Sequence, residues 1–431
     1  SARECEVDAA YEYSAEPQSG YYVLVDAEIF EVNGTKFNNL EEASAAAGNG
    51  GTVTLLRNFA ALDTQKTVAS ITLDLGGFTL SVGDDDAISM GSFSVKGLKV
   101  TIKNGTVSSE NGTAVSYGDG IAVTLENVTL RGKIGISFDG TKDKEGNNNA
   151  LTVQNGVSIY GTDIAIELSA PNNASIVNIT GGVISGKTAL SVDSDNAQIA
   201  IKGGVFEGDI AAPNLTDFIE GGSFDTELDA AYLAADYEQN ESGVVVEKGN
   251  EAAVARVIAA DGTFKYYETL YAAVDAAKDG ETVEILVKNI SDTEGGSAQV
   301  TAAGQVWLYA KNKSLTIEGN GATLTASNHT FPFYYRNDYS TDNAYTLTIN
   351  NLTIDASGKA TSALAVYGEH LNVYLDGVTL YSHDVTALNA NGTKAKGVPL
   401  LFTGRMDEEL TREDDPAITA VLSRSTLNAP G

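Results

Sequence analysis

One short phrase recurs along this chain and constrains its fold more than any other feature. In each copy, apolar and polar residues alternate up to a corner rich in Asn and Gly, and the alternation then resumes. Examples are VTIKNGTV (100–107), VTLENVTL (123–130), VNITGGVI (177–184), IAIKGGVF (199–206) and LTINNLTI (347–354). The apolar residue before the corner recurs every 18 to 28 residues, as Ile102, Leu125, Val153, Ile179, Ile201 and Ile219. A period of this kind indicates a repeat architecture.

Each phrase predicts two short strands joined by a sharp bend. The alternation places Val, Ile and Leu on one face of the strands and polar residues on the other. The Asn-Gly and Gly-Gly pairs tolerate the positive φ that a bend requires. One unit cannot bury its own apolar row, but stacking successive units in parallel register buries it. We therefore expect an all-β fold, a parallel β-helix.

An antiparallel sandwich or barrel is the main competing interpretation, because those folds also contain many closely spaced short strands. The recurring identity of the corner favours the β-helix, since a sandwich does not need the same corner in every repeat.

Two short helices interrupt the β pattern, at NNLEEASAAAGNGGTVTLL (38–56) and YETLYAAVDAAKDGETVEIL (267–286), which align at an offset of 230 residues. Each places four small or apolar residues on one helical face. They are Leu40, Ala43, Ser44 and Ala47 in the first copy, and Leu270, Ala273, Val274 and Ala277 in the second. An open solenoid end exposes apolar side chains and unpaired backbone. We therefore interpret each helix as the cap that starts a β-helical unit.

This duplication predicts the organisation of the chain. A leader with an extended strand occupies residues 1–30, and the first β-helix unit with its capping helix occupies 31–250. A second, shorter unit, with its own capping helix and an acidic C-terminal segment, occupies 251–431.

The charge balance excludes several classes of partner. The chain has 58 Asp and Glu against 27 Lys and Arg, a formal charge of −31. Binding to phosphate backbones needs clustered basic residues, so we expect no nucleic-acid partner. No apolar run approaches the ~20 residues of a membrane-spanning helix, so we expect no membrane insertion. Cys5 is the only cysteine, which excludes a disulfide within one chain.

Three features together resemble a known family: the segment GTFKYYETLYAAVDAAKDGETVEIL (262–286), the strand–Asn/Gly corners, and the stretch EGGSFDTELDAAYLAADYEQNESGVVVE (220–247). They are similar to the repetitive, adhesin-like β-helix surface proteins of gut-dwelling, mostly Gram-positive bacteria, within the pectin-lyase-like fold group. The resemblance covers most of residues 20–390. It implies a right-handed β-helix and an extracellular, cell-surface location. No LPxTG-type sorting signal is present, so the mode of anchoring is left open.

A polysaccharide-active enzyme is the alternative function, because this fold group includes pectate lyases and polygalacturonases. Glycoside hydrolysis needs two carboxylates that converge on one groove. YGTDIAI (160–166), with Asp163, and GDDD (83–86) resemble two polygalacturonase phrases, but the GHG and RIK phrases are missing. The two segments also lie about three repeats apart. We therefore expect no catalytic residues and no enzyme.

Two acidic clusters are candidate Ca²⁺ sites, because Ca²⁺ prefers carboxylate and carbonyl oxygens. The first cluster lies in FDGTKDKEGNNNA (138–150) and the second in GDDDA (83–87). Their candidate ligands are Asp139, Asp143 and Glu145 in the first, and Asp84, Asp85 and Asp86 in the second. Solvated turns explain the same residues, and we expect no other cofactor.

The segment HTFPFYYRNDYSTDNAY (329–345) is the candidate partner-binding surface. Tyr- and Arg-rich patches make effective recognition surfaces. The candidate residues are Phe333, Tyr334, Tyr335, Arg336 and Tyr339. Packing of these rings into the core is the competing interpretation, because large aromatic side chains are buried on average.

The sequence therefore predicts a non-enzymatic, extracellular bacterial surface protein that acts as an adhesin or stalk, with a host glycan or protein as its partner. Head-to-tail self-assembly is a further expectation. In it, the leading segment YYVLVDAEIF (21–30) would complete the open end of the next copy.

Overall fold

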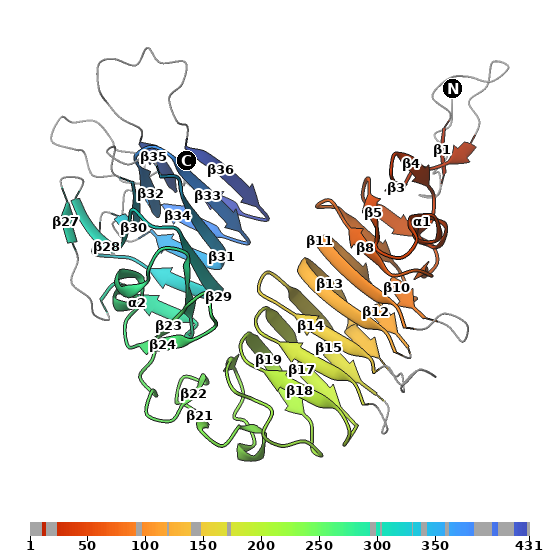
Figure 1. Ribbon diagram of the computed structural model, residues 1–431, viewed down its shortest axis with the longest axis horizontal. Coiled ribbons are helices and arrows are strands. Elements are labelled where there is room, and N and C mark those ends of the chain that lie inside the picture. The colour runs from red at the N-terminus through yellow and green to blue at the C-terminus, as the bar shows by residue number, and fades with distance from the viewer. Residues whose placement is uncertain are drawn as a thin grey trace, which may run out of the picture. The chain divides into compact units, whose positions relative to one another are not determined.

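A computed structural model describes residues 11–13, 24–91, 97–118, 120–138, 148–169, 174–293, 299–301, 304–329, 331–337, 343–357, 362–382, 399–403 and 418–428. The chain divides into two compact units, Ser1–Gln239 and Asn240–Gly431. Both consist mainly of strands in parallel sheets (Figure 1). The boundary predicted from the sequence, at residue 250, falls inside the second unit.

Three parallel ladders of strands run through unit 1. The first contains β5 (Gly51–Leu55), β8 (Ile71–Asp74), β11 (Lys99–Ser109), β13 (Ala122–Phe138), β14 (Ala150–Val153), β16 (Ile176–Ile179) and β18 (Gln198–Ile201). The second contains β6 (Phe59–Ala61), β9 (Thr79–Val82), parts of β11 and β13, β15 (Ser158–Leu168), β17 (Val183–Val192), β19 (Val205–Ala211) and β20 (Ser223–Phe224). The third contains β7 (Gln65–Thr67), β10 (Ile88–Met90), β12 (Thr113–Tyr117) and the last residues of β13, β15, β17 and β19.

The repeated apolar residue forms one continuous column across the first ladder. Its members pair in parallel register from each repeat to the next, in the order Ile102, Leu125, Val153, Ile179, Ile201 and Ile219. All of them are fully buried. The period found in the sequence is therefore the stacking period of the core.

The corners adopt the backbone conformation that their residues favour. Asn104 has a φ of 58° and Gly182 a φ of 93°, both in the left-handed region. At Gly182 a β-carbon would also lie 2.8 Å from the carbonyl oxygen of Val157, so a larger residue would be strained on two counts. The corner residues thus bend the chain where the phrase predicts it.

Both units begin in the same way. In unit 1, β3 (Phe30–Val32) pairs antiparallel with β4 (Thr35–Phe37) and with β5, and α1 (Leu40–Ala47) contacts all three. In unit 2, β23 (Ala255–Ile258) pairs antiparallel with β24 (Phe264–Tyr267) and β25 (Glu281–Ile285), and α2 (Leu270–Ala276) contacts them. The side chains of Asn39 and Thr269 cap the two helices by accepting hydrogen bonds from Glu42 N and Ala272 N.

The predicted inner faces of the helices are confirmed for most of their residues. Leu40, Ala43 and Ser44 are buried in α1, as are Leu270, Ala273 and Val274 in α2. Ala47 is only half-buried, and Ala277 is buried but follows the last residue of α2. In unit 2 the Lys313 ammonium also donates hydrogen bonds of 2.6 Å to the carbonyl oxygens of Val274 and Ala277. A cation at the last carbonyl groups of a helix is favourable because they carry partial negative charge.

Unit 2 also contains three parallel ladders. The first continues from β25 through β29 (Leu315–Thr325), β31 (Tyr345–Ala356), β33 (Leu371–Asp376) and β36 (Thr419–Ser423). The second contains β26 (Asn289–Ser291), parts of β29 and β31, β34 (Thr379–Ser382) and β37 (Thr426–Asn428). The third contains β28 (Gly304–Lys311), β30 (Phe331–Arg336), β32 (Leu364–Tyr367) and β35 (Leu400–Thr403), with β27 (Gln299–Thr301) antiparallel to β28.

The remaining elements are short. They are β1 (Tyr11–Tyr13) paired antiparallel with β2 (Leu24–Asp26), η1 (Ala230–Tyr232), β21 (Tyr237–Gln239) and β22 (Val245–Glu247). The predicted all-β class is confirmed, and the long parallel ladders are compatible with a β-helix-like solenoid. An antiparallel sandwich does not account for them.

The buried column makes a direct prediction. Replacing Ile102 by Ala should lower the free energy of unfolding of unit 1 by about 2–5 kcal/mol, because it opens a cavity in a fully buried stack. Urea denaturation followed by far-UV circular dichroism measures the change. Thr101→Ala, on the neighbouring outward position of the same strand, is the matched control and should change it by less than about 0.5 kcal/mol. Equal effects of the two variants would contradict the inward assignment of Ile102.

Candidate functional site

The carboxylate singled out for hydrolysis is held between two lysines. Lys187 Nζ lies 2.5 Å from Asp163 Oδ1, and Lys133 Nζ lies 3.9 Å from Oδ2. The hydrogen bond and charge of Lys187 lower the pKa of Asp163. A carboxylate kept ionised in this way is a poor general acid at neutral pH.

Two of the three carboxylates of the Asp84–Asp86 turn are used within the fold, whereas Asp85 accepts a hydrogen bond from Ser109 Oγ through its backbone carbonyl oxygen. Asp84 Oδ1 accepts a hydrogen bond of 2.7 Å from Asn111 Nδ2, and Asp86 Oδ1 accepts one of 3.0 Å from Thr113 N. Within the described ranges, no group of three or more His, Cys, Asp or Glu residues is placed to hold a metal ion. The other candidate Ca²⁺ ligands, Asp139, Asp143 and Glu145, lie outside the described residues, so that hypothesis is untested.

The aromatic segment is only partly a surface. Phe333 and Tyr335 point into the core, with side chains 1% and 0% exposed, so they are not available to a ligand. Their registry explains why: Phe333 pairs with Leu308 and Leu364 in the inner column of the third ladder. The prediction of a surface role is therefore wrong for these two residues.

Tyr334 and Arg336 alternate with the inward pair and lie on the outer side of β30. The Tyr334 ring lies 5.9 Å from that of Tyr309 and 6.4 Å from that of Tyr367, centroid to centroid. The Arg336 guanidinium lies 5.4 Å from the Tyr367 ring. Tyr334 is itself mostly buried by this cluster. Tyr339 lies outside the described residues, and partner binding by the cluster stays a prediction.

A hollow on the outer side of the third ladder in unit 1 is lined mainly by hydroxyl groups. Ser89, Ser116 and Ser137 stand in register on successive strands, and Glu167 follows in the same row. The Ser137 hydroxyl donates a hydrogen bond of 2.7 Å to Glu167 Oε2. The hollow has a volume of about 380 Å³ and reaches Asp86 at its edge. Such a surface can exchange hydrogen bonds with a polar ligand, but each of its two carboxylates already has a partner.

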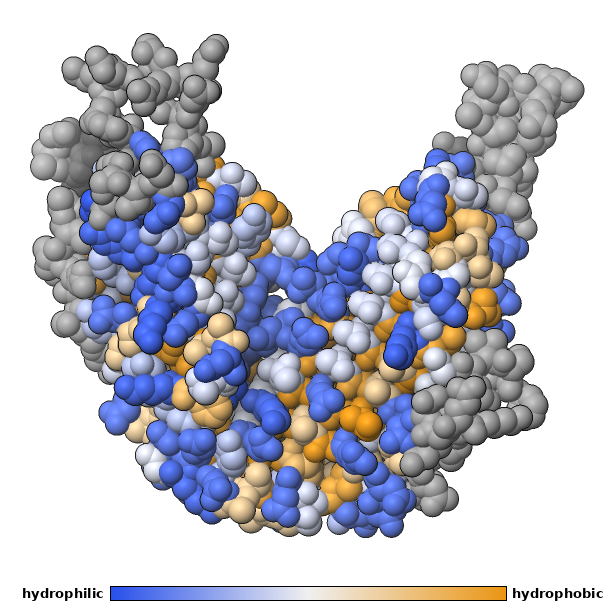
Figure 2. All heavy atoms as spheres, in the orientation of Figure 1, coloured by the Kyte–Doolittle hydropathy of each residue, from blue (hydrophilic) through white to orange (hydrophobic). Residues whose placement is uncertain are grey.

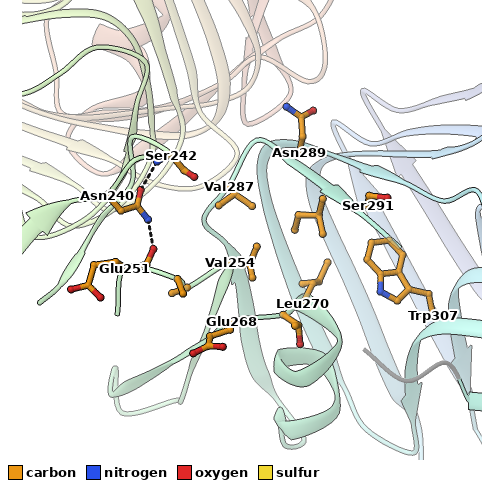
Figure 3. A pocket seen from close by; sticks show the side chains of 14 residues that line it. Asn240, Ser242, Glu251, Val254, Glu268, Leu270, Val287, Asn289, Ser291 and Trp307 are labelled. Atoms are coloured by element: carbon orange, nitrogen blue, oxygen red, sulfur yellow. Dashed lines mark hydrogen bonds between the residues drawn. The ribbon is translucent and has the colours of Figure 1, made fainter. Parts of the chain in front are cut away.

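A second cavity lies in unit 2, where the chain enters the unit, beside the start of α2 (Figure 3). Its volume is about 310 Å³. Asn240 fixes its rim: Asn240 Oδ1 accepts hydrogen bonds of 3.0 Å from the backbone nitrogens of Ser242 and Val244, and Nδ2 donates one of 2.8 Å to the carbonyl oxygen of Glu251. The rim is therefore formed before any ligand arrives.

Trp307 forms one wall of this cavity. Its side chain is only 2% exposed. The indole nitrogen is buried and has no hydrogen-bond partner in the part of the chain that the structure describes. The cavity itself could not be predicted, because its residues come from five separate stretches between 240 and 307.

A row of polar side chains crosses the outer side of the first ladder in unit 2. Arg256, Glu284, Glu318, Asn350 and Asp376 stand in register on successive strands. Arg256 Nε lies 2.5 Å from Glu284 Oε2. Asn350 donates a hydrogen bond to Glu318 Oε1, whereas Glu318 Oε2 is buried without a partner among the described residues. Burial, with the nearby charges of Glu284 and Asp376, raises the pKa of Glu318 to about 7.

This pKa shift predicts a pH dependence. Between about pH 4.5 and 7 the folded chain holds a proton on Glu318 that the unfolded chain has lost, so stability falls as the pH rises through that window. Glu318→Gln should therefore stabilise unit 2 at pH 8 by about 1–3 kcal/mol and have little effect at pH 5. Urea unfolding followed by the emission of Trp307, the only tryptophan, measures both values.

Glu284→Gln is the contrasting variant. It leaves the buried Arg256 guanidinium without its charged partner, so it should destabilise unit 2 at both pH values. A gain from Glu318→Gln that is equal at pH 5 and pH 8 would show that the group does not titrate in this range.

Comparisons with protein-family models, with curated proteins and with solved structures found no match. The family resemblance drawn from the sequence therefore stays a prediction. None of the helices in the described ranges is both long and apolar enough to cross a membrane.

Proposed function

We propose that this chain is a non-enzymatic, extracellular structural protein, adhesin-like or stalk-forming, built from two right-handed parallel β-helix units. The observation that carries the proposal is the repeated start of the units: the same antiparallel hairpin, helix and first strand occur twice. A self-capping module is suited to tandem use, because each copy brings its own cover for the apolar end of the column.

The three ladders support the β-helix. Most repeats contribute one strand segment to each ladder, and the segments in one ladder pair in parallel with the next repeat. A three-sided coil gives this pattern. Right-handed winding is the expected sense, because parallel crossovers between strands of L-residues are right-handed in nearly all cases.

The outer surface supports a binding or structural role over hydrolysis. On the face shown in Figure 2, hydrophilic residues are spread over both units. Asp163 is paired with lysines, and Asp86 and Glu167 each accept a hydrogen bond within the fold. No observation on the described residues favours the enzyme alternative. We propose that the chain lies at the bacterial surface and that its partner there is a glycan or a protein of the host.

The last strands of unit 2 support self-association. Leu422 continues the inner column below Leu375, and Leu427 continues the column below Leu380. Both are nevertheless more than 40% exposed, because no further described strand covers them. Figure 2 shows hydrophobic residues at the edge where β36 lies in Figure 1. An apolar strand edge of this kind favours pairing with another chain.

The proposed donor strand needs revision. In segment 21–30, Leu24–Asp26 pairs with β1, and Phe30 pairs with β4 and β5 of its own unit. Ile29 and Phe30 are fully buried there. This segment therefore already pairs within its own unit. We propose instead that the exposed strands β36 and β37 of unit 2 contact the surface of another copy.

The double variant Leu422→Asp/Leu427→Asp tests this surface. Charged side chains at the uncovered end should abolish self-association, because a buried unpaired carboxylate is costly. Sedimentation velocity over a range of protein concentrations measures it. Leu62→Asp is the matched control, since Leu62 is an isolated leucine of unit 1 that is 72% exposed. A wild-type chain that stays monomeric at every concentration would contradict self-assembly, and a closed dimer would contradict head-to-tail assembly.

A further inference from the structure

We propose that the hollow on the third ladder of unit 1 binds a glycan that carries a free amine, with the ammonium group on Glu167 and the sugar hydroxyls along the neighbouring row of serines. The hollow has a volume of about 380 Å³. The inference goes beyond the structural role proposed above, because it rests on this hollow alone. Failure of its test would leave that role untouched.

The row of hydroxyl groups is the first argument. Ser89, Ser116 and Ser137 stand opposite one another on β10, β12 and β13, and each of them is partly exposed. The hydroxyls of Ser89 and Ser116 have no hydrogen-bond partner among the residues that the structure describes. Because neighbouring strands are ~4.8 Å apart, the row from Ser89 to Glu167 is about 14 Å long. It therefore offers evenly spaced hydroxyls to a ligand that is longer than one sugar ring.

Small residues keep the hollow open above a rigid floor. Gly91 and Gly118 line it directly beyond β10 and β12, and a β-carbon at Gly118 would meet no atom within 4 Å. Beneath the hollow, the inward rings of Tyr117 and Phe138 stack with their centroids 4.6 Å apart. Binding on such a floor does not have to order the strands, which lowers its entropic cost.

The charges of the lining define the ligand class. Asp86 and Glu167 line the hollow, and none of its described lining residues is Lys, Arg or His. Each carboxylate is held through one oxygen: Glu167 Oε2 accepts from the Ser137 hydroxyl, and Asp86 Oδ1 accepts from Thr113 N. A carboxylate has about four acceptor positions, so Glu167 Oε1 can accept a further hydrogen bond from a ligand. An ammonium group is the matching donor, because its hydrogen bonds to a carboxylate are assisted by charge.

The Glu167 end of the row is the position for the ammonium group. Lys66 stands in register with Ser89 on the next strand, which disfavours a ligand cation at that end. Lys133, on β13, lies 3.9 Å from Asp163 Oδ2 and does not line the hollow. A neutral sugar gains no charge interaction at Glu167, and an anion would be repelled by a chain of formal charge −31.

Trisaccharides with the same β-1,4 backbone test the ligand class. The glucosamine, N-acetylglucosamine and glucose trimers differ only in the group at carbon 2 of each ring. Isothermal titration calorimetry of the full chain, in ~0.15 M salt to screen long-range attraction, should show saturable one-to-one binding of the glucosamine trimer. Its dissociation constant should be on the order of 1 mM. The other two trimers lack the ammonium group, and cyclohexylamine lacks the hydroxyls, so each should bind at least about tenfold more weakly.

Three variants locate the ligand. Glu167→Gln removes the charge in the hollow and should weaken binding of the glucosamine trimer about tenfold. Glu126→Gln is the matched control, because it removes the same charge from an exposed position on the first ladder and should weaken binding less than about twofold. Ser116→Leu places an apolar side chain in the middle of the row and should abolish binding. It decides the question if Glu167→Gln does not fold.

Four outcomes would overturn the proposal. Absence of saturable binding of the glucosamine trimer at about ten times the expected constant would leave the hollow without this ligand. Equal losses in Glu167→Gln and Glu126→Gln would show general attraction to an acidic chain. Cyclohexylamine binding as tightly as the trimer would show that the serine row is not used. Unchanged binding by a folded Ser116→Leu variant would place the ligand elsewhere.

Discussion

Parallel register between successive repeats is the constraint on which the structure depends. A column such as Ile102, Leu125 and Val153 excludes water only if each repeat presents its apolar residue at the same height. A slip of one residue would turn the whole row outward, because side chains alternate along a strand. The Asn and Gly corners oppose this slip by fixing where the chain bends in each repeat. The loops between the strands can then differ in length without disturbing the core.

The same constraint creates the need for caps. Nothing in the repeat pattern itself covers the first layer of a column, so the apolar side chains of that layer would face water unless another element covers them. In both units an antiparallel hairpin and a short amphipathic helix provide that cover. Helices this short are marginal alone. They are stable here because Leu40 and Leu270 pack onto the first layer and a side chain caps each N-terminus.

Most of this architecture could be predicted from the sequence, because it depends on local patterns. The marker residues, the corners and the buried helix faces all follow from periodicity. The aromatic segment 329–345 is where the prediction from the sequence was incomplete. Composition suggested one exposed patch, whereas the alternation of a strand sends Phe333 and Tyr335 inward and Tyr334 outward. Applying the two-residue period to residues 333–336 would have separated the two groups, although Phe331 packs against Tyr334 and does not follow it. The use of segment 21–30 within its own unit could not be foreseen, because strand pairing is a long-range property.

The unit 2 cavity was inaccessible to sequence reasoning for a related reason. A regular stack of repeats fills its own interior, since each layer places an apolar side chain against the next. Open space arises where the regular stacking is interrupted, and the entry of unit 2 is such a place. There the chain arrives through the Asn240 turn, passes into the antiparallel hairpin and the helix, and only then begins parallel pairing. Segments that obey different pairing rules meet around Trp307 without filling the space between them. The start of a unit is therefore the place where an open space can remain between elements that a regular stack would fill.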